Sequence, residues 1–82
     1  MDSYFYVYIL KSKVDETKHY VGSTQNIEER LIKHNQGGCP HTKKYKPWKV
    51  ETAIAFSDKQ KAQSFEKYLK SHSGRAFSKI HF

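Results

Sequence analysis

Alternating side chains near the start of the chain predict a central β-strand. Along residues 4–10 every second side chain falls on the same face, and both faces carry aromatic or aliphatic residues. A strand covered on both sides has this pattern, because each of its faces packs against another element. After a polar turn over residues 11–17, a second short strand is expected at 18–22, paired with the first as an antiparallel hairpin. A third strand is expected at residues 48–56.

Helical periodicity predicts a first helix over residues 26–36. Asn26 and Glu29 have the spacing of a capping box, a common arrangement at the start of a helix. Gly37 and Gly38 follow the expected last residue and end the helix. Residues 39–47 hold two prolines and several lysines, and we expect them to form a basic loop.

A second helix is expected over residues 58–70, with Ser57 and Gln60 as its capping box. Residues 71–74 interrupt the pattern, and residues 75–80 are expected to add further helical turns. No repeat or linker divides the chain, so we expect a single domain over residues 1–82. The elements combine into an α+β fold, in which a three-stranded antiparallel or mixed sheet is flanked by helices in the order ββαβαα.

Both helices place ionisable side chains on the face that should be apolar. Arg30 and His34 fall within an arc of about 100° that also holds the apolar residues of the first helix. Glu66 lies in the apolar stripe of the second helix. Burying an unpaired charge costs several kcal/mol, so these groups require partners, a metal ion or a solvated cleft. They are therefore candidates for a functional site.

Two tyrosines complete the candidate chemistry. Tyr8 and Tyr20 share a face of the expected hairpin, where same-face neighbours lie about 5–8 Å apart, and the first helix follows Tyr20 closely. Two phenols, a guanidinium, an imidazole and a carboxylate meet the needs of phosphodiester hydrolysis, which requires a proton acceptor, a cation beside the phosphate and a divalent ion. On the strand pattern alone, the tyrosines also fit ordinary cross-strand packing.

The charge balance indicates a polyanionic partner. The chain has fifteen Lys and Arg residues and eight Asp and Glu residues, which gives a formal net charge of +7. This charge favours nucleic acid as the partner, although a basic surface also increases solubility. Lysines and aromatic rings occur together near residue 45, a mixture that suits backbone neutralisation and base stacking. The alternative is a solvated loop that Trp48 anchors to the core. The residues that we expect to contact nucleic acid are Lys43, Lys44, Lys46, Trp48, Lys70 and Arg75.

The cysteine content and the hydropathy of the chain indicate which cellular compartment to expect. Cys39 is the only cysteine, which excludes an internal disulfide framework and a thiolate cluster for zinc, and we expect a cytoplasmic protein. No apolar run approaches the roughly 20 residues that a membrane-spanning helix needs. The aromatic start of the chain has the pattern of a strand and lacks the features of a signal peptide.

The ordered set of motifs resembles the GIY-YIG nuclease domain, and more closely the small stand-alone bacterial members of that superfamily. The resemblance runs over about residues 4–80 and rests on YVY at 6–8, YVG at 20–22, Arg30 and His34 on the first helix, and Glu66 within FEKYLK. The first triplet begins with Tyr6, where many members carry glycine. The resemblance implies the α+β fold already expected.

The resemblance also implies roles for five residues. Tyr8 corresponds to the tyrosine proposed as the general base toward water, and Tyr20 to one that contacts the scissile phosphate or orients the water. Arg30 corresponds to the arginine that stabilises charge on the phosphate, and His34 to a histidine that assists Tyr8. Glu66 corresponds to the carboxylate that holds one Mg²⁺ or Mn²⁺. Such enzymes produce a 5′-phosphate and a 3′-hydroxyl.

We therefore expect a metal-dependent endonuclease that hydrolyses phosphodiester bonds in DNA, favoured over RNA, with structural or weak sequence selectivity. Several nucleases of the superfamily use a C-terminal asparagine near the site, and this chain has none after Asn35. A catalytically weak or inactive nucleic-acid-binding module of the same fold is the alternative, and a basic adaptor for a protein is a third hypothesis. A homodimer or a protein partner is left open, and no membrane association is expected.

Overall fold

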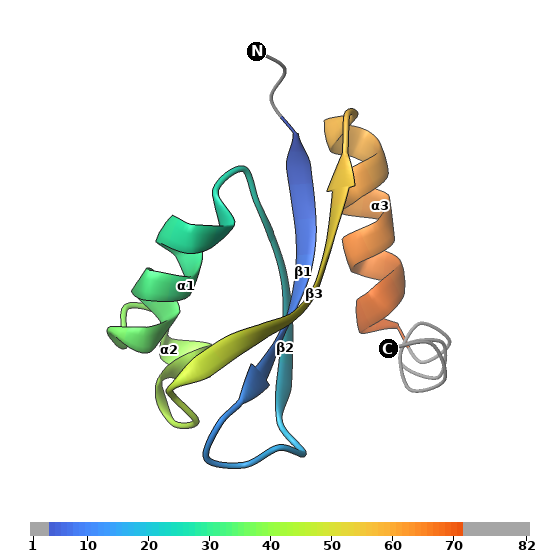
Figure 1. Cartoon of the computed structure of the whole chain (residues 1–82). Helices are drawn as coiled ribbons and strands as arrows, with labels where there is room; N and C mark the ends of the chain where they lie inside the picture. Colours follow the sequence, from blue (N-terminus) through green and yellow to red (C-terminus); the bar gives the residue numbers. More distant parts are fainter. Residues whose placement is uncertain (1–3, 72–82) are drawn as a thin grey trace.

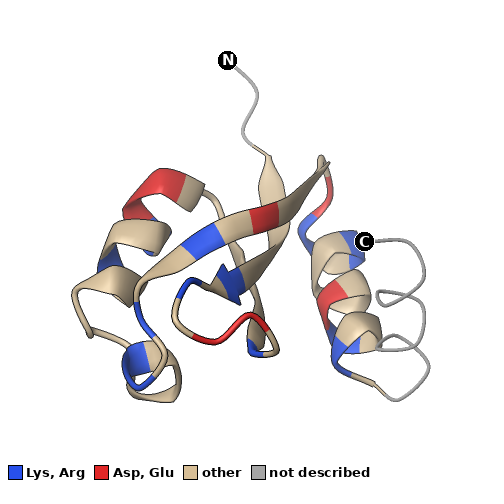
Figure 2. Cartoon of the chain, turned by 60° about the horizontal axis from the view of Figure 1, so that its bottom comes forward, with Lys and Arg blue, Asp and Glu red and all other residues tan. Residues whose placement is uncertain are grey.

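Strand β1 (Phe5–Ser12) lies in the middle of a three-stranded antiparallel sheet of order β2-β1-β3. The computed structural model describes residues 4–71. Helices α1 and α2 lie on one side of the sheet and α3 lies on the other, in both Figure 1 and the turned view of Figure 2. The remaining elements are β2 (His19–Thr24), α1 (Ile27–Asn35), α2 (Pro40–Lys43), β3 (Trp48–Phe56) and α3 (Lys59–Lys70).

The strand pairing confirms the predicted hairpin and the central position of β1. Tyr8 pairs with Gly22 and Leu10 with Tyr20 across the hairpin, so Tyr8 and Tyr20 are diagonal neighbours on one face. The pairing of β1 with β3 shifts register between Ile9 and Leu10, as a β-bulge does. The α+β class and the antiparallel sheet flanked by helices are therefore confirmed.

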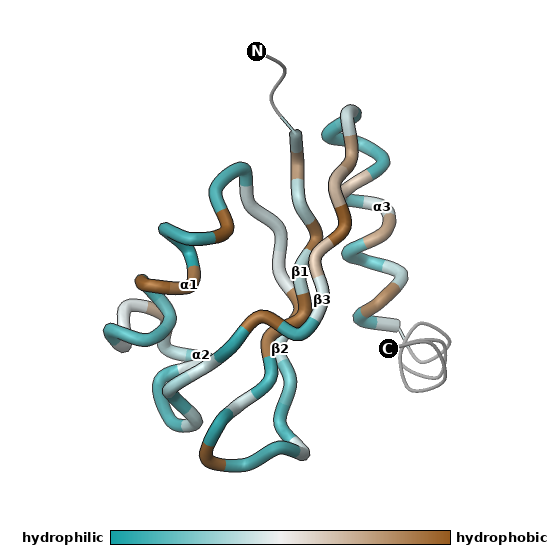
Figure 3. The backbone as a smooth tube through the Cα atoms, viewed as in Figure 1, coloured by the Kyte–Doolittle hydropathy of each residue, from teal (hydrophilic) through white to brown (hydrophobic). Residues whose placement is uncertain are grey.

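The sheet separates two hydrophobic clusters, one on each face. Val7 and Ile9 point toward α3, where they pack with Ala62 and Leu69. On the other face Tyr8, Leu10 and Trp48 form a second cluster, against which residues of α1 pack. In Figure 3 much of the hydrophobic colour lies along the strands, whereas most of the loop between β1 and β2 is hydrophilic. The alternation along β1 therefore places successive residues in different cores.

The two longer helices, α1 and α3, begin at different N-cap residues, Asn26 and Asp58. Asn26 caps α1 by accepting a hydrogen bond from the Glu29 backbone N–H at 3.0 Å, as predicted. The predicted cap of α3 is wrong: Asp58, and not Ser57, is the cap residue, and its carboxylate accepts from the Gln60 N–H at 2.8 Å. An aspartate suits this position because its negative charge also interacts favourably with the helix N-terminus.

The segment expected to be a basic loop contains the short helix α2. Pro40 occupies the start of this helix, where proline is well tolerated because the missing N–H would be unpaired anyway. Thr42 is fully buried, and the Trp48 indole Nε1 donates to its carbonyl oxygen at 2.8 Å. Burial of these two side chains therefore fixes α2 against the sheet. The helical turns expected at 75–80 lie outside the described residues.

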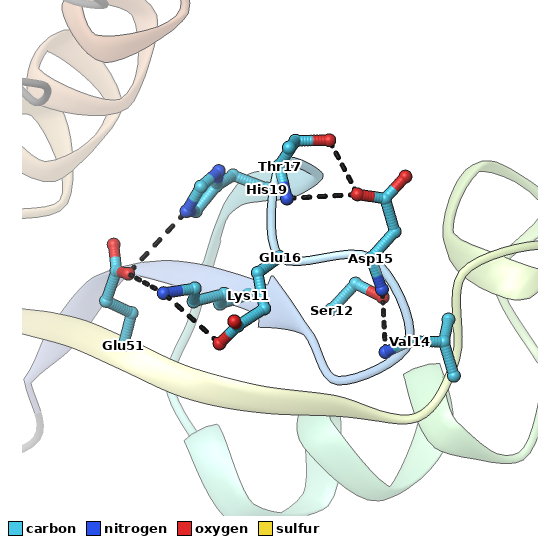
Figure 4. A network of polar contacts seen from close by, with 8 residues as sticks. All are labelled: Lys11, Ser12, Val14, Asp15, Glu16, Thr17, His19 and Glu51. Atoms are coloured by element: carbon cyan, nitrogen blue, oxygen red, sulfur yellow. Dashed lines mark hydrogen bonds and ion pairs between the residues drawn. The ribbon is translucent and has the colours of Figure 1, made fainter.

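Polar contacts hold the loop between β1 and β2 (Figure 4). The buried Ser12 hydroxyl accepts from the backbone N–H groups of Val14 and Asp15 at 3.2 and 3.1 Å. The Lys11 ammonium lies 3.9 Å from a carboxylate oxygen of Glu51 on β3. The end of β1 therefore holds the loop backbone through Ser12 and is linked to β3 through Lys11. None of the described helices is long and apolar enough to cross a membrane.

The side chain of Asn35 joins the end of α1 to the start of β3. Its Oδ1 accepts from the Trp48 N–H at 2.5 Å, and its Nδ2 donates to the Trp48 carbonyl at 3.1 Å. The amide thus pairs with both backbone groups of one residue, much as a neighbouring strand would. A side chain with only acceptors cannot do so.

We predict that Asn35→Asp lowers the free energy of unfolding by about 1–3 kcal/mol, because the Trp48 carbonyl loses its donor and faces a carboxylate. Asn26→Asp is the matched control: it is the same chemical change, but aspartate caps a helix about as well as asparagine. Urea unfolding followed by tryptophan fluorescence measures both. Equal stabilities of the two variants would contradict the bridging role of Asn35.

Candidate active site

The phenol of Tyr8 crosses the space above Gly22 on the neighbouring strand. A Cβ atom added to Gly22 would lie 2.5 Å from the Tyr8 hydroxyl oxygen and 2.7 Å from Cζ. Only glycine leaves this space open, so the ring lies over Gly22 of the edge strand β2 and stays 1% exposed. The ring of Tyr20 lies beside it, with centroids 6.4 Å apart. The structure therefore brings the two predicted phenols together.

His34 lies in the last turn of α1 and is fully buried. Its Nε2 is 3.0 Å from the Tyr8 hydroxyl oxygen, and its Nδ1 is 2.8 Å from the Thr42 hydroxyl oxygen. The imidazole also contacts the Tyr20 ring, with centroids 4.9 Å apart. Both ring nitrogens are thus hydrogen-bonded, which orients the imidazole firmly.

Arg30 lies one helical turn before His34 and acts electrostatically on three of the other four predicted residues. Its guanidinium lowers the pKa values of Tyr8, His34 and Glu66, in each case beside larger causes. Within residues 4–71, no hydrogen-bond partner reaches the buried Nε atom of Arg30. A buried N–H without a partner costs free energy, and a bound anion would satisfy it.

Glu66 approaches from α3, on the other side of the sheet. The Ser23 hydroxyl of β2 donates to Oε1 at 2.6 Å, and the Lys70 ammonium donates to Oε2 at 2.8 Å. Burial raises the pKa of Glu66, but hydrogen bonds from Lys70 and Ser23, with the charges of Lys70 and Arg30, outweigh burial and hold that pKa below its usual value. The carboxylate is therefore ionised at neutral pH.

Tyr8 and His34 have pKa shifts that favour their neutral forms. Burial raises the pKa of Tyr8 to about 12, and Tyr20 adds to this effect, while Arg30 opposes it through its charge and its hydrogen-bonding capacity. Burial, followed by the charges of Arg30 and Lys33, lowers the pKa of His34. Without substrate the site thus keeps the phenol protonated and the imidazole neutral. Because its pKa is raised, the Tyr8 hydroxyl can release its proton only if its oxygen accepts another proton at the same time.

The donor set at Glu66 fits one magnesium or manganese ion. No group of three or more His, Cys, Asp or Glu side chains that could hold a metal occurs among the residues that the structure describes. Mg²⁺ does not require such a group, because it commonly binds one or two carboxylates, several waters and substrate phosphates. The ionised carboxylate of Glu66 can serve as the protein ligand, and the unpaired N–H of Arg30 can bind the substrate phosphate.

The residues expected to contact nucleic acid have different positions. Lys43, Lys44 and Lys46 are exposed on α2 and the loop after it, where Figure 2 shows basic residues at one end of the molecule. Trp48 is only 3% exposed and packs in the core, so the expectation that its ring contacts nucleic acid is wrong and the alternative, in which Trp48 anchors this segment to the core, is correct. Lys70 forms the ion pair with Glu66. Arg75 lies outside the described residues.

Sequence reasoning missed three residues that contact the site. Gly22 lies two residues after Tyr20, on the same face of the strand. Its place opposite Tyr8 could therefore have been inferred from the hairpin register. For Ser23 and Thr42, the sequence contains no pattern that would have singled them out as site residues. A serine in an edge strand is unremarkable, and Thr42 lies in a segment without hydrophobic periodicity.

We predict that Gly22→Ala destabilises the protein by about 1–3 kcal/mol, because the added methyl group overlaps the buried Tyr8 ring. Ala55→Ser, which adds one heavy atom at an exposed position of β3, is the control and should change stability little. Thermal unfolding measures both variants. A Gly22→Ala protein as stable as the parent would show that Tyr8 does not occupy this space.

Comparisons with known proteins agree with this geometry. The family model of the GIY-YIG catalytic domain matches residues 4–80. A UPF0213 protein of Clostridium perfringens is 46% identical over 66 residues, which cover 79% of this chain and 69% of that protein. The structure-specific endonuclease subunit SLX1 of Debaryomyces hansenii is 36% identical over 73 residues, covering 80% of this chain but 21% of the subunit.

A solved structure supports the same relationship. The solution NMR structure of a UPF0213 protein from Bacillus halodurans matches with a TM-score of 0.56 and 31% identity, covering 94% of this chain and 81% of that one. The resemblance inferred from the motifs is thereby confirmed, and the chain belongs to the GIY-YIG family.

Proposed function

We propose that this protein is a metal-dependent endonuclease that hydrolyses phosphodiester bonds in DNA with structural or weak sequence selectivity. The observation that carries the proposal is the buried, unpaired Nε of Arg30, whose guanidinium acts on both the Tyr8 phenol and the Glu66 carboxylate. Membership of the GIY-YIG family and the similarity to a structure-specific endonuclease subunit support nuclease activity.

In this proposal Arg30 binds the scissile phosphate. A phosphate oxygen accepts the hydrogen bond that Nε lacks, and the positive charge stabilises the negative charge that grows on phosphorus during attack. Tyr20, whose ring contacts both Tyr8 and His34, orients the attacking water through its hydroxyl. Two of the predicted residues are thus assigned to the substrate.

Tyr8 and His34 move the proton. As water attacks phosphorus, its proton passes to the Tyr8 oxygen while the phenol proton passes to His34 Nε2. The new bond joins the water oxygen to phosphorus, and the bond to the 3′ oxygen breaks with its electron pair. That oxygen takes a proton from solvent, which leaves a 5′-phosphate and a 3′-hydroxyl. No free phenolate forms, which agrees with the raised pKa of Tyr8.

Glu66 would hold the divalent ion. When bound, the ion would supply positive charge at the phosphate and leaving oxygen. Family membership supports a divalent ion in general, and the choice of Mg²⁺ or Mn²⁺ follows from the oxygen donor.

The exposed lysines provide the binding surface for the DNA backbone. Lys18 and Lys44 also lie 5.4 and 5.5 Å from the centroid of the Tyr45 ring, which adds charge and an aromatic surface next to α2. Such contacts carry little sequence information, in accordance with weak sequence selectivity. The proposed site of action is the cytoplasm.

One observation favours the alternative of a binding module without cleavage. Both oxygens of Glu66 are already hydrogen-bonded, to Ser23 and Lys70. The Lys70 ammonium competes with a metal cation for this carboxylate. A protein in which this ion pair persisted in place of the metal ion would bind DNA without hydrolysing it.

We predict that the protein cleaves nicked or branched DNA in the presence of Mg²⁺ or Mn²⁺. Tyr8→Phe and Glu66→Gln should each reduce the rate by about 10²-fold or more, because one removes the proton carrier and the other the charge that holds the ion. Tyr6→Phe, on the same face of the same strand, and Glu28→Gln, on the surface of α1, are the matched controls. Single-turnover cleavage of labelled substrates measures the rates.

The same substrates separate the alternatives. Salt-sensitive binding of DNA without cleavage by the parent protein would support the module and exclude the enzyme. Binding that does not weaken between about 50 and 200 mM salt would contradict phosphate contacts altogether.

We further predict that Lys70→Met increases the affinity for Mn²⁺ by about twofold to fivefold, the range expected from removing one partly exposed ion pair that competes for the carboxylate. Lys67→Met on the same helix is the control. Electron paramagnetic resonance of free Mn²⁺ measures binding without DNA. An unchanged affinity would mean that the ion does not compete with Lys70 for Glu66.

A further inference from the structure

A line of three buried side chains runs from β1 through α1 to α2. Tyr8 is 1% exposed, and His34 and Thr42 are 0% exposed. The Tyr8 oxygen is 3.0 Å from His34 Nε2, and His34 Nδ1 is 2.8 Å from Thr42 Oγ1. Buried polar groups of this kind need hydrogen-bond partners, so the direction of each hydrogen bond along the line matters.

The hydrogen of the Thr42 hydroxyl has its own acceptor. Oγ1 donates to the Cys39 carbonyl oxygen at 3.3 Å, within the first turn of α2. A threonine hydroxyl has a single hydrogen to donate. Toward His34, therefore, Oγ1 acts as an acceptor, and the hydrogen between them belongs to Nδ1.

The hydrogen of the Tyr8 hydroxyl leads to the same assignment from the other end. Among the described residues, the groups that act on this hydroxyl by hydrogen bonding are His34 Nε2 and the Arg30 guanidinium. Arg30 can only donate. The buried phenol hydrogen thus requires His34 Nε2 as its acceptor, and a neutral imidazole can accept there only if its hydrogen is on Nδ1.

We propose that Thr42 is a positioning residue that holds His34 in the tautomer with hydrogen on Nδ1, so that Nε2 faces Tyr8 as a proton acceptor. The proposal rests on the proposed function and adds a residue to its machinery. Thr42 contacts neither substrate nor metal and acts through His34 alone.

The consequence for catalysis follows from the direction of the hydrogen bonds. In the opposite tautomer Nε2 donates to the phenol, which then has no group to take its proton and cannot accept one from water. A base held by a third group in this way recurs among enzymes that activate a nucleophile. After transfer the imidazolium donates from Nδ1 to Thr42, whose oxygen stabilises the new charge.

Helix α2 provides the support for Thr42. The Trp48 indole donates to the Thr42 carbonyl at 2.8 Å, and Asn35 binds the Trp48 backbone. The carbonyl of Thr42 is thereby anchored to the core, and its hydroxyl is held within reach of His34.

Nuclear magnetic resonance of ¹⁵N-histidine-labelled protein tests the proposal directly, because long-range ¹H–¹⁵N correlations distinguish the two tautomers. We expect hydrogen on Nδ1 of His34 in the parent protein and in Thr42→Ser, which keeps the hydroxyl. In Thr42→Val, a near-isosteric change, the population with hydrogen on Nε2 should increase. Thr52→Val on β3 is the control and should leave the His34 signals unchanged.

Cleavage rates provide the second measurement. Thr42→Val should reduce the single-turnover rate at saturating DNA by about tenfold or more, part of the usual contribution of a general base, while the DNA affinity stays within about twofold of the parent. Thr42→Ser should restore most of the rate. If Thr42 had only a structural role, Thr42→Val would lower the stability of the protein but would not reduce the cleavage rate while leaving the DNA affinity unchanged.

The outcomes are distinguishable. Hydrogen on Nε2 of His34 in the parent protein overturns the proposal whatever the activity, and this measurement does not depend on whether Thr42→Val folds. A folded Thr42→Val protein with parental tautomer and rate also overturns it. If His34 carries its hydrogen on Nδ1 but no DNA is cleaved, the proposed function fails while the assignment of the tautomer stands.

Discussion

The site depends on the hydrogen bond between the Tyr8 hydroxyl and His34 Nε2, at 3.0 Å. It is possible because the hairpin register sets Gly22 opposite Tyr8 and leaves room for the phenol to pass. A one-residue slip would turn Tyr8 into the other hydrophobic cluster. The same bond joins the sheet to α1, which carries Arg30, so strand register and site geometry are fixed together.

Much of the fold and several site residues could be predicted because their side chains repeat with a regular period. The alternation through Tyr8 indicated a strand buried on both faces, and β1 is the central strand. Arg30, His34 and Glu66 could be singled out because ionisable groups on an apolar stripe need an explanation. The observed partners of Glu66 supply that explanation in part.

Features that depend on irregular segments or on contacts distant in sequence could not be predicted. Thr42 lies in a single turn of helix, too short to show a period, and its importance comes from His34, eight residues away. Trp48 follows a basic segment, so the sequence left two roles open for its ring, and only its packing with Tyr8 and Leu10 decides for the core. Likewise, a sequence does not reveal that Glu66 on α3 binds Ser23 of β2, on the side of the sheet opposite to Arg30.

In a chain of this size the core and the site share residues. A domain of about 60–80 residues buries only some 60% of its unfolded surface, and Tyr8 accordingly lies in the same cluster as Leu10 and Trp48. Its polar contacts must be satisfied inside close-packed surroundings, which do not deform easily. In the proposed function, the response to a substrate is therefore left to two half-buried groups outside this cluster. Arg30 has an N–H without a partner among the described residues, and Glu66 is paired with the half-exposed Lys70 ammonium. In the proposed mechanism, the rigid proton path and the adaptable phosphate site are thus separate parts of one small structure.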